Sequence, residues 1–328
     1  MPLLSSTYTP PIVFRNYHLS TIYASMLRKV PKPVQTRERV ELEDGDFIDL
    51  DWTLSRAGNT KKLVVVLHGL EGNSQRPYVR GMVNRFTKQN WDAVAVNLRG
   101  CSGEMNRLYR SYNAGASEDL REIIHHLLKS KNYHTISLVG FSLGGNLLLK
   151  YLGEEKHTPA EVKAAVAIST PCDLYRSLKR LEEPQNFIYS QRFVSKLKKQ
   201  LHLRGAKFPE HLSPEDISRC KSLYAIDDLY TGRAHGFKNA REYYEQSSAL
   251  NFIPNISIPT LLINAKNDAF LSPNSSPGDM ALNNPQFYLE TPEYGGHVGF
   301  IQKKNSTYAE DRALEFLSQN GEIKIEDK

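Results

Sequence analysis

The sequence predicts an α/β protein in which a mostly parallel β-sheet is flanked by helices, with a helical insertion late in the chain. From about residue 37, strand-like and helix-like segments alternate, as in a parallel sheet covered on both faces. Several strand segments are continuous apolar runs, which is typical of strands buried on both sides. The strand pattern disappears between residues 173 and 250. A length of 328 residues suits one large domain with an insertion, or two ordinary domains.

Residues 37–172 are expected to form the first part of the core. Two alternating segments around the turn Asp44-Gly45 predict a β-hairpin at one edge of the sheet. Apolar residues at helical spacing predict three helices, and Glu118 and Asp119 suit the first turn of the second one. The expected strands cover residues 37–43, 47–54, 63–67, 91–98, 136–139 and 162–169, and the helices lie near residues 79–86, 120–128 and 143–152.

Two further segments differ from this alternating pattern. Residues 1–36 carry several X-Pro steps around a short amphipathic piece, 19–27, and are expected to pack along the core as an N-terminal arm. Residues 173–250 contain a short apolar helical stripe, formed by Val194, Leu197 and Leu201. We expect this second segment to form a helical cap over the carboxyl ends of the strands.

Residues 251–328 are expected to complete the core. Strand patterns return at 260–264 and 286–290. The last helix is predicted to begin at Thr307, because Thr307 and Glu310 have the spacing of a capping box.

Composition excludes several classes of protein. The net charge is +6, and no block of basic residues interleaved with aromatic ones suggests binding to nucleic acid. The modest basic excess within residues 173–250 fits a solvated face of mixed charge, or a segment that helps to hold an anionic headgroup or makes a peripheral membrane contact. The apolar runs are too short to span a bilayer, and the N-terminal residues lack the pattern of a signal peptide. Three widely spaced cysteines, Cys101, Cys172 and Cys220, fit neither a disulfide framework nor a zinc site, which suggests a cytoplasmic protein.

One serine lies in a pattern that carries chemistry. Residues 140–144 read G-F-S-L-G and fit G-x-S-x-G, with an expected strand before Ser142 and an expected helix after it. A sharp turn of this kind needs small neighbours, and it lifts the serine oxygen out of the sheet beside a helix N-terminus. The alternative is a glycine-rich turn without chemistry, because short motifs also arise by chance.

A serine hydroxyl needs a base and an orienting acid to become a nucleophile. In this kind of turn the chain order is serine, then acid, then histidine. Asp268 follows the expected strand at 260–264, and His297 follows the strand at 286–290 inside the loop YGGHVGF. Asp279 and Asp173 are rival acids. The other nine histidines fit the role of base less well. They are expected on a helix, in loops, in the cap, in the arm, or at the end of the sheet away from Ser142.

Two backbone N–H groups are expected to form an oxyanion hole. One belongs to the residue after the nucleophile, Leu143. The other should come from the loop HGLEG after the strand at 63–67, where Leu70 is the predicted donor. His68 is expected to orient this loop, because no companion residues suggest a metal site.

These stretches together resemble a known family. HGLEG, NLRGCSG, GFSLGGN, NDAF and GGHVGF are similar to motifs of the α/β-hydrolase superfamily, and more narrowly of the YheT-like esterases with their plant and animal relatives. Residues 16–22 and 224–248 also match that branch, so the resemblance covers residues 12–318. It implies the α/β-hydrolase fold, with Ser142, Asp268 and His297 as a catalytic triad. The triplet Asn16-Tyr17-His18 departs from the family's Asn-Gly-His, and the pair Asn267-Asp268 from its Asp-Asp.

Two other features suggest weaker hypotheses. His211 and Asp216 form a literal H-x-x-x-x-D, an acyltransferase pattern, but they fall in a loop of the cap that is expected to lie away from Ser142. Arg99 could bind an anionic substrate. We expect instead that it anchors its own loop through backbone carbonyls.

We therefore expect a cytoplasmic serine hydrolase that cleaves carboxylic esters with short- to medium-chain acyl or lipid-like groups, through an acyl-enzyme on Ser142. No metal or organic cofactor is implied. The alternatives are an acyltransferase that passes the acyl group to an alcohol, and a non-catalytic protein that binds acyl lipids. The sequence does not indicate the acyl chain length or the alcohol of the substrate, the oligomeric state or how the cap opens, because these depend on how surfaces pack.

Overall fold

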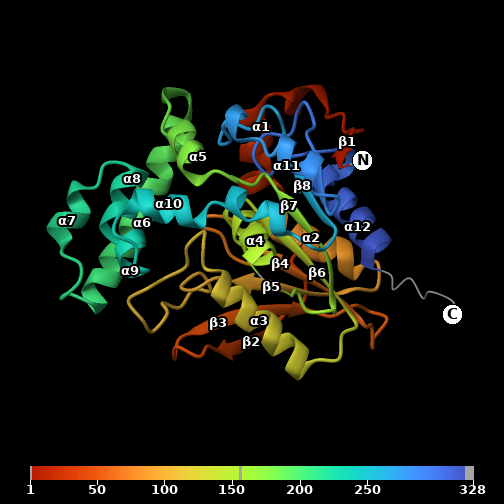
Figure 1. Ribbon diagram of the computed structural model, residues 1–328, viewed down its shortest axis with the longest axis horizontal. Helices are drawn as coiled ribbons and strands as arrows, with labels where there is room; N and C mark the ends of the chain where they lie inside the picture. Colours follow the sequence, from red (N-terminus) through yellow and green to blue (C-terminus); the bar gives the residue numbers. More distant parts are fainter. Residues whose placement is uncertain (1, 155–156, 322–328) are drawn as a thin grey trace.

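A computed structural model describes residues 2–154 and 157–321 and shows the predicted α/β-hydrolase architecture (Figure 1). Its centre is a nine-stranded sheet in the order β1-β9-β8-β7-β6-β4-β5-β3-β2. All neighbouring strands run parallel except where β3 meets β2 and β5, so the hairpin lies at an edge, as predicted. The strands are Leu3–Leu4 (β1), Thr36–Glu41 (β2), Phe47–Thr53 (β3), Lys62–Leu67 (β4), Asp92–Asn97 (β5), Thr135–Phe141 (β6), Val162–Ile168 (β7), Thr260–Ile263 (β8) and Phe287–Glu290 (β9). Residue 1 of the expected arm, residues 155–156 within the expected first core part and residues 322–328 at the end of the second part lie outside the described residues.

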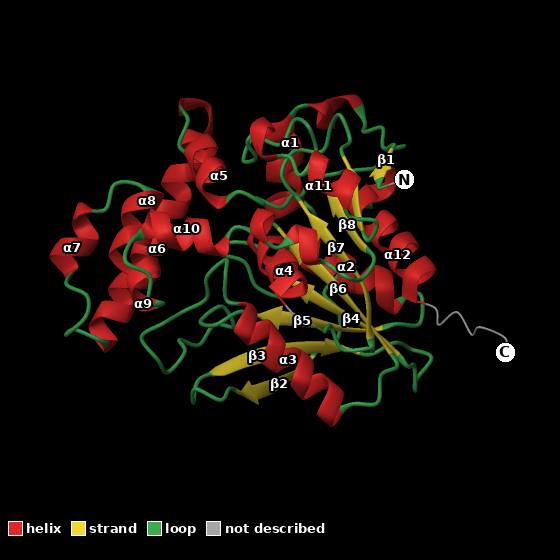
Figure 2. Ribbon diagram, viewed as in Figure 1, coloured by secondary structure: helices red, strands yellow, loops and turns green. Residues whose placement is uncertain are grey.

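Helices cover both faces of the sheet (Figure 2). On one face lie α3, α4 and α11, whose apolar residues share a cluster with one side of the strands. On the other face lie α2 and α12. These helices are Pro77–Thr87 (α2), Ser117–Ser130 (α3), Leu143–Glu154 (α4), Gly278–Asn283 (α11) and Tyr308–Gly321 (α12).

Strand β4 shows why the strand segments read as continuous apolar runs. Leu63, Val65 and Leu67 pack into the cluster with α3 and α4, whereas Val64 and Val66 pack into the cluster with α2 and α12. All five side chains are fully buried. Both alternating sets are therefore apolar, because each has a helical layer to bury it.

The N-terminal arm packs against the second part of the core. Strand β1 pairs in parallel with β9. Only two residues long, it is too short to show a strand pattern, and the sequence did not predict it. Helix α1 (Tyr17–Ile22) follows and continues into the π-turn Tyr23–Leu27. Immediately after this turn, the Arg28 guanidinium donates two hydrogen bonds to the Glu310 carboxylate, at 2.5 and 2.9 Å.

Breaking this ion pair should destabilise the protein. The side chains of Arg28 and Glu310 are almost fully buried, so Arg28→Met leaves a buried carboxylate without its counter-charge. We expect the free energy of unfolding in urea to fall by about 3 kcal/mol. The matched control is Asp311→Asn, which breaks the exposed pair with Arg85 and should cost less than about 1 kcal/mol. Equal losses in the two variants would contradict this assignment.

Helices α5–α10, here called the cap, gather to one side of the sheet (Figure 1). They share an apolar cluster of their own, which meets the core at Ala269 and Phe270. Within the described residues, no helix is both long and apolar enough to cross a membrane. The cap helices are Leu174–Leu181 (α5), Phe187–Lys207 (α6), Pro214–Arg219 (α7), Leu223–Ile226 (α8), Gly232–Ala234 (α9) and Ala240–Ser247 (α10), with the π-turn Asp227–Thr231 between α8 and α9.

Candidate active site

Ser142 lies in a strained turn between β6 and α4. Its φ angle is +52°, in the left-handed region that non-glycine residues rarely occupy. Two glycines make the turn sterically feasible. A Cβ added at Gly140 would lie 2.5 Å from the carbonyl oxygen of Gly144, and one added at Gly144 would lie 2.5 Å from that of His68. The sequence therefore folds here into a tight elbow, with the serine side chain lining a pocket.

The structure brings Asp268 and His297 to this serine. His297 Nε2 lies 2.9 Å from Ser142 Oγ, and His297 Nδ1 lies 2.9 Å from Asp268 Oδ2. A carboxylate only accepts hydrogen bonds, so Nδ1 carries the proton and Nε2 is free to accept one from the serine. Asp268 is buried and also accepts a hydrogen bond from the backbone N–H of Phe270. The Phe270 ring packs 4.3 Å from the imidazole, centroid to centroid.

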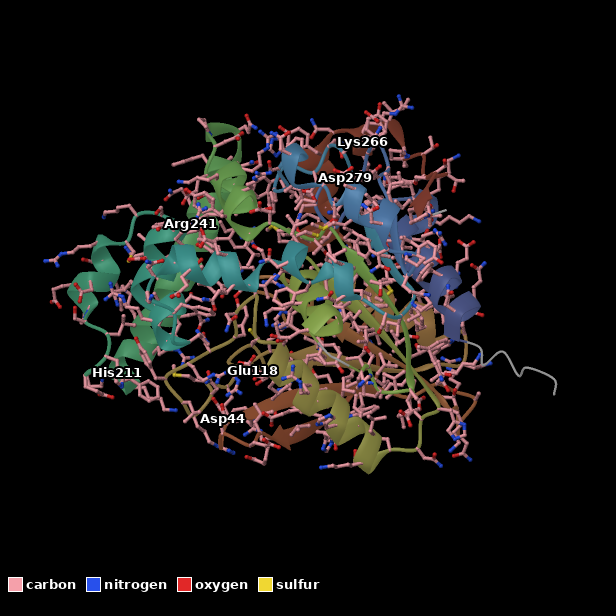
Figure 3. All side chains as sticks on the ribbon, in the orientation of Figure 1. Asp44, Glu118, His211, Arg241, Lys266 and Asp279 are labelled. Atoms are coloured by element: carbon pink, nitrogen blue, oxygen red, sulfur yellow. The ribbon has the colours of Figure 1, made fainter. Side chains whose placement is uncertain are left out.

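The rival acids and the H-x-x-x-x-D pattern lie elsewhere. Asp279 is exposed on α11. Asp173 is the N-cap residue of α5, where its carboxylate accepts a hydrogen bond from the backbone N–H of Arg176. His211 lies at the outer end of the cap, far from Asp279 on the opposite side of the molecule (Figure 3). Asp216 bonds to Ser213 within the cap. Among the described residues, Asp268 is the carboxylate that contacts His297, and none of these others does.

The two predicted oxyanion donors lie next to Ser142. A Cβ added at Gly69 would lie 3.0 Å from Ser142 Cβ, so the loop that carries Leu70 packs directly against the nucleophile turn. Leu143 is the first residue of α4, where backbone N–H groups have no partner within the helix. Across the described chain, neither Leu70 nor Leu143 donates its N–H to a protein acceptor. Both groups are free to bind an oxygen in the pocket.

The ring of His68 is fully buried, and hydrogen bonds at both of its nitrogens orient this loop. Its Nδ1 lies 2.8 Å from the carbonyl oxygen of Gly69, and its Nε2 accepts the backbone N–H of Leu98 at 3.2 Å. Burial lowers the pKa of His68 to about 4, so the ring is neutral and holds one tautomer. Two tyrosine hydroxyls fix the rest of the loop: Tyr78 accepts from the N–H of Gly69, and Tyr112 from that of Glu71.

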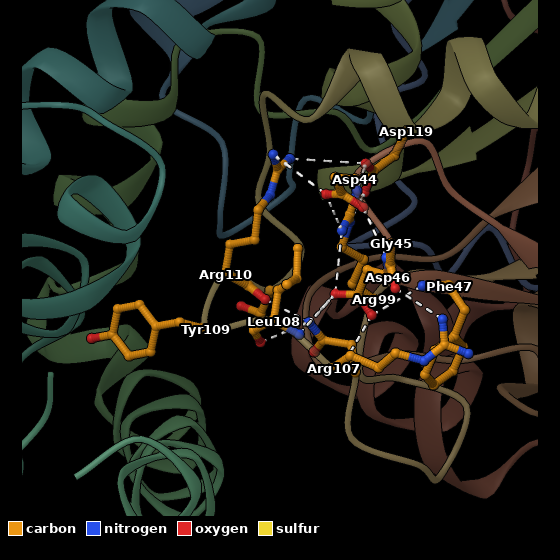
Figure 4. Close-up of polar contacts among 12 residues, drawn as sticks. Asp44, Gly45, Asp46, Phe47, Arg99, Arg107, Leu108, Tyr109, Arg110 and Asp119 are labelled. Atoms are coloured by element: carbon orange, nitrogen blue, oxygen red, sulfur yellow. Dashed lines mark hydrogen bonds and ion pairs between the residues drawn. The ribbon is translucent and has the colours of Figure 1, made fainter. Parts of the chain in front are cut away.

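The prediction that Arg99 bonds to backbone carbonyls is wrong. Its guanidinium is 1% exposed and pairs with the carboxylates of Asp119, Asp44 and Asp46 (Figure 4). Arg99 thereby joins its loop to the β2–β3 turn and to the start of α3. A buried guanidinium binds carboxylates because it needs negative charges to offset the loss of water. The sequence did not indicate these partners, because the three aspartates are distant from Arg99 along the chain. With its charge neutralised in this way, Arg99 offers little to an anionic substrate.

The sequence did not anticipate that the arm supports the histidine loop. Thr21 Oγ1 accepts the backbone N–H of His297 at 2.9 Å, and Ser20 Oγ donates to the carbonyl of Gly295 at 2.9 Å. Asn267 accepts the N–H of Gly296 and donates to the carbonyl of Arg15, which ties the Asp268 loop to both segments. The only hint was the match of residues 16–22 to the family, which carried no role for these side chains.

Replacing Thr21 should misplace the imidazole. In Thr21→Val the buried N–H of His297 loses its acceptor while the shape of the side chain is kept. We expect kcat on a p-nitrophenyl ester to fall about ten-fold with little change in KM, which corresponds to about 1.4 kcal/mol in the barrier. Thr21→Ser keeps the hydroxyl and should retain the parent rate. A lower melting temperature with an unchanged kcat would contradict the positioning role.

The site opens into a pocket of about 820 Å³. Ser142, Leu143 and His297 line it together with other loops of the core, and side chains of the arm and cap complete the walls. Many of the wall residues are apolar or aromatic, among them Leu178, Ile188, Phe193, Leu197, Tyr230 and Phe270. Within residues 2–154 and 157–321, no group of three or more histidine, cysteine or acidic residues is arranged to hold a metal ion.

Comparison with known proteins places the chain in a family. Residues 62–304 match the family model described as alpha/beta hydrolase fold. YheT of Escherichia coli (strain K12) is 37% identical over 301 residues, covering 90% of this chain and 88% of that protein. Phospholipase ABHD3 of Mus musculus is 28% identical, covering 92% and 75% respectively. The solved structure of the Pyrococcus furiosus esterase PF2001 superposes with a TM-score of 0.59 at 18% identity, over 90% of this chain and 97% of that one. The chain therefore belongs to the α/β hydrolase fold family, in the branch that contains YheT.

Proposed function

We propose that this protein is a serine hydrolase that cleaves carboxylic esters through an acyl-enzyme on Ser142. The observation that carries the proposal is the chain of contacts from Ser142 through His297 to the buried Asp268, beside a largely apolar pocket that Ser142 and His297 line. Relatives named as esterase, phospholipase and monoacylglycerol lipase support ester chemistry for this protein.

In the acylation step, Ser142 Oγ attacks the ester carbonyl carbon while His297 Nε2 takes the hydroxyl proton. The carbonyl oxygen becomes an oxyanion that accepts hydrogen bonds from the N–H groups of Leu70 and Leu143. Asp268 holds the imidazole in the required tautomer and stabilises its positive charge. When the intermediate collapses, the bond to the alcohol oxygen breaks, and His297 returns the proton to the departing alcohol.

Deacylation repeats these steps with water. His297 takes a proton from water as the resulting hydroxide adds to the acyl carbon. The bond to Ser142 Oγ then breaks, the proton returns to the serine, and the free acid leaves.

The cap, within residues 173–250, defines the acyl side of the pocket in this proposal. Its apolar walls and the volume of about 820 Å³ suit short- to medium-chain acyl groups or a lipid-like ester. Such walls gain free energy from burying methylene groups, and they lack the many polar partners that a peptide or sugar would need.

The test is hydrolysis of p-nitrophenyl esters of increasing acyl length by the parent and by Ser142→Ala. We expect turnover that peaks at an intermediate length, and loss of turnover in the variant at every length. Adding excess ethanol distinguishes the alternatives, because a hydrolase yields mainly free acid and an acyltransferase yields mainly ethyl ester. An absence of turnover with tight binding of the ester to the parent would instead indicate a non-catalytic acyl-lipid binder.

A further inference from the structure

Three cationic side chains line one part of the pocket. Arg76 precedes α2, and Arg192 and Lys196 lie four residues apart on α6, so that their side chains share one face of that helix. The core and the cap thus both contribute to this group, which we call the cationic wall.

The cationic wall has little counter-charge. In the described part of the chain, none of its three members forms an ion pair with a carboxylate, unlike Arg28, Arg37, Arg39 and Arg99. Arg76 donates to the backbone carbonyl of Glu71, and Arg192 contacts the sulfur of Met26, a weak acceptor. Burial, followed by the charges of Arg76 and Arg192, lowers the pKa of Lys196. Like charges that repel one another in this way destabilise the protein unless an anion joins them.

One carboxylate in the same part of the pocket, Glu71, acts against this repulsion. Its negative charge raises the pKa of Lys196. The same carboxylate also accepts a hydrogen bond from the Tyr112 hydroxyl at 3.2 Å, so it does not serve the cations alone. The other acidic residue lining the pocket, Asp227, is bound by Thr231 and Tyr244 at 2.6 Å each and belongs to the cap interior. Three cations therefore share a single nearby carboxylate.

The cationic wall lies close to the reacting centre. The carbonyl that Arg76 binds belongs to Glu71, the residue next to the oxyanion donor Leu70. An anion held by Arg76 would thus lie in the same pocket as the ester bond, so the anion and the ester can belong to one substrate.

We propose that Arg76, Arg192 and Lys196 form a subsite for an anionic group, a phosphate or a carboxylate, carried by the ester substrate. Guanidinium and ammonium groups are the side chains that bind such oxyanions, with Arg giving paired hydrogen bonds and Lys a point charge. This inference rests on the proposed function and specifies its substrate class: an amphiphilic ester with an apolar acyl chain and a negative charge near the ester.

The test compares matched octanoyl esters with and without an anionic group on the alcohol. One pair is 1-octanoylglycerol 3-phosphate against 1-octanoylglycerol, and the other is 4-(octanoyloxy)butanoate against butyl octanoate, so the two pairs distinguish phosphate from carboxylate. We expect the parent to favour the anionic member of at least one pair by about ten-fold or more in kcat/KM. The double variant Arg192→Gln/Lys196→Gln should remove that preference. Arg76 is left intact because it supports the oxyanion loop.

The control variant is Arg219→Gln, on the exposed outer helix α7, which should keep the preference of the parent. A parent without preference in either pair, or a double variant that keeps it, would overturn the subsite. Calorimetric binding of the same pairs to Ser142→Ala, with and without the two cap substitutions, tests the subsite without turnover. If neutral esters are hydrolysed but charge makes no difference, only the subsite fails. If no ester is hydrolysed, the proposed function fails, and the binding experiment still decides the subsite.

Discussion

His297→Ala should lower kcat/KM on p-nitrophenyl esters by about 10⁵-fold. In the parent, the imidazole lies 2.9 Å from the serine oxygen, and no other basic side chain among the described residues contacts that oxygen. Without a base to take its proton, the hydroxyl at neutral pH is a poor nucleophile. The measurement is steady-state hydrolysis, with circular dichroism to show that the variant is folded.

The matched control is His211→Ala. His211 is half-exposed at the outer end of the cap and should be dispensable for the chemistry. Retention of activity within ten-fold in His297→Ala would mean that another group acts as the base. Loss of activity in His211→Ala would instead give weight to the H-x-x-x-x-D pattern of the cap.

Asp268→Asn should lower kcat by about 10⁴-fold while leaving the fold intact. The asparagine fills the same space, but its amide can donate toward Nδ1 and thereby favour the tautomer that carries its proton on Nε2. The imidazole then presents an N–H to Ser142 in place of a lone pair. It also loses the negative charge that stabilises its protonated form.

Two control variants separate Asp268 from its rivals. Asp279→Asn removes an exposed charge on α11, and Asp173→Asn keeps an amide oxygen that still caps α5. Both should retain nearly the parent rate. A large loss in Asp173→Asn, together with a small one in Asp268→Asn, would assign the orienting role to Asp173.

Much of the fold could be predicted because its pattern is local. The strand at residues 63–67 is apolar at every position, which occurs when helices cover both faces, and the structure confirms it as β4. The turn at Ser142 was predictable for the same reason, since its close contacts leave no room for side chains at Gly140 and Gly144. Carboxyl ends of parallel strands meet at one edge of a sheet, so the strands before Ser142, Asp268 and His297 also indicated that these residues approach one another.

Other features depend on contacts between segments far apart in the chain. Strand β1 exists because β9 offers an open edge to a two-residue segment, which no local pattern records. Thr21 supports His297 across 276 positions, and Arg99 reaches carboxylates on two other elements. The cationic wall likewise forms only when α6 of the cap comes to face the loop before α2. Residue types are visible in the sequence, but their meeting depends on tertiary packing.

The central claim is that Ser142 is the nucleophile, and covalent labelling tests it most directly. The protein is treated with a fluorophosphonate probe, digested, and analysed by mass spectrometry to find the modified residue. We expect stoichiometric modification of Ser142, no modification of the Ser142→Ala variant, and protection of the parent by a slowly hydrolysed ester. Equal labelling of Ser142→Ala and the parent, or modification at a different residue, would contradict the account.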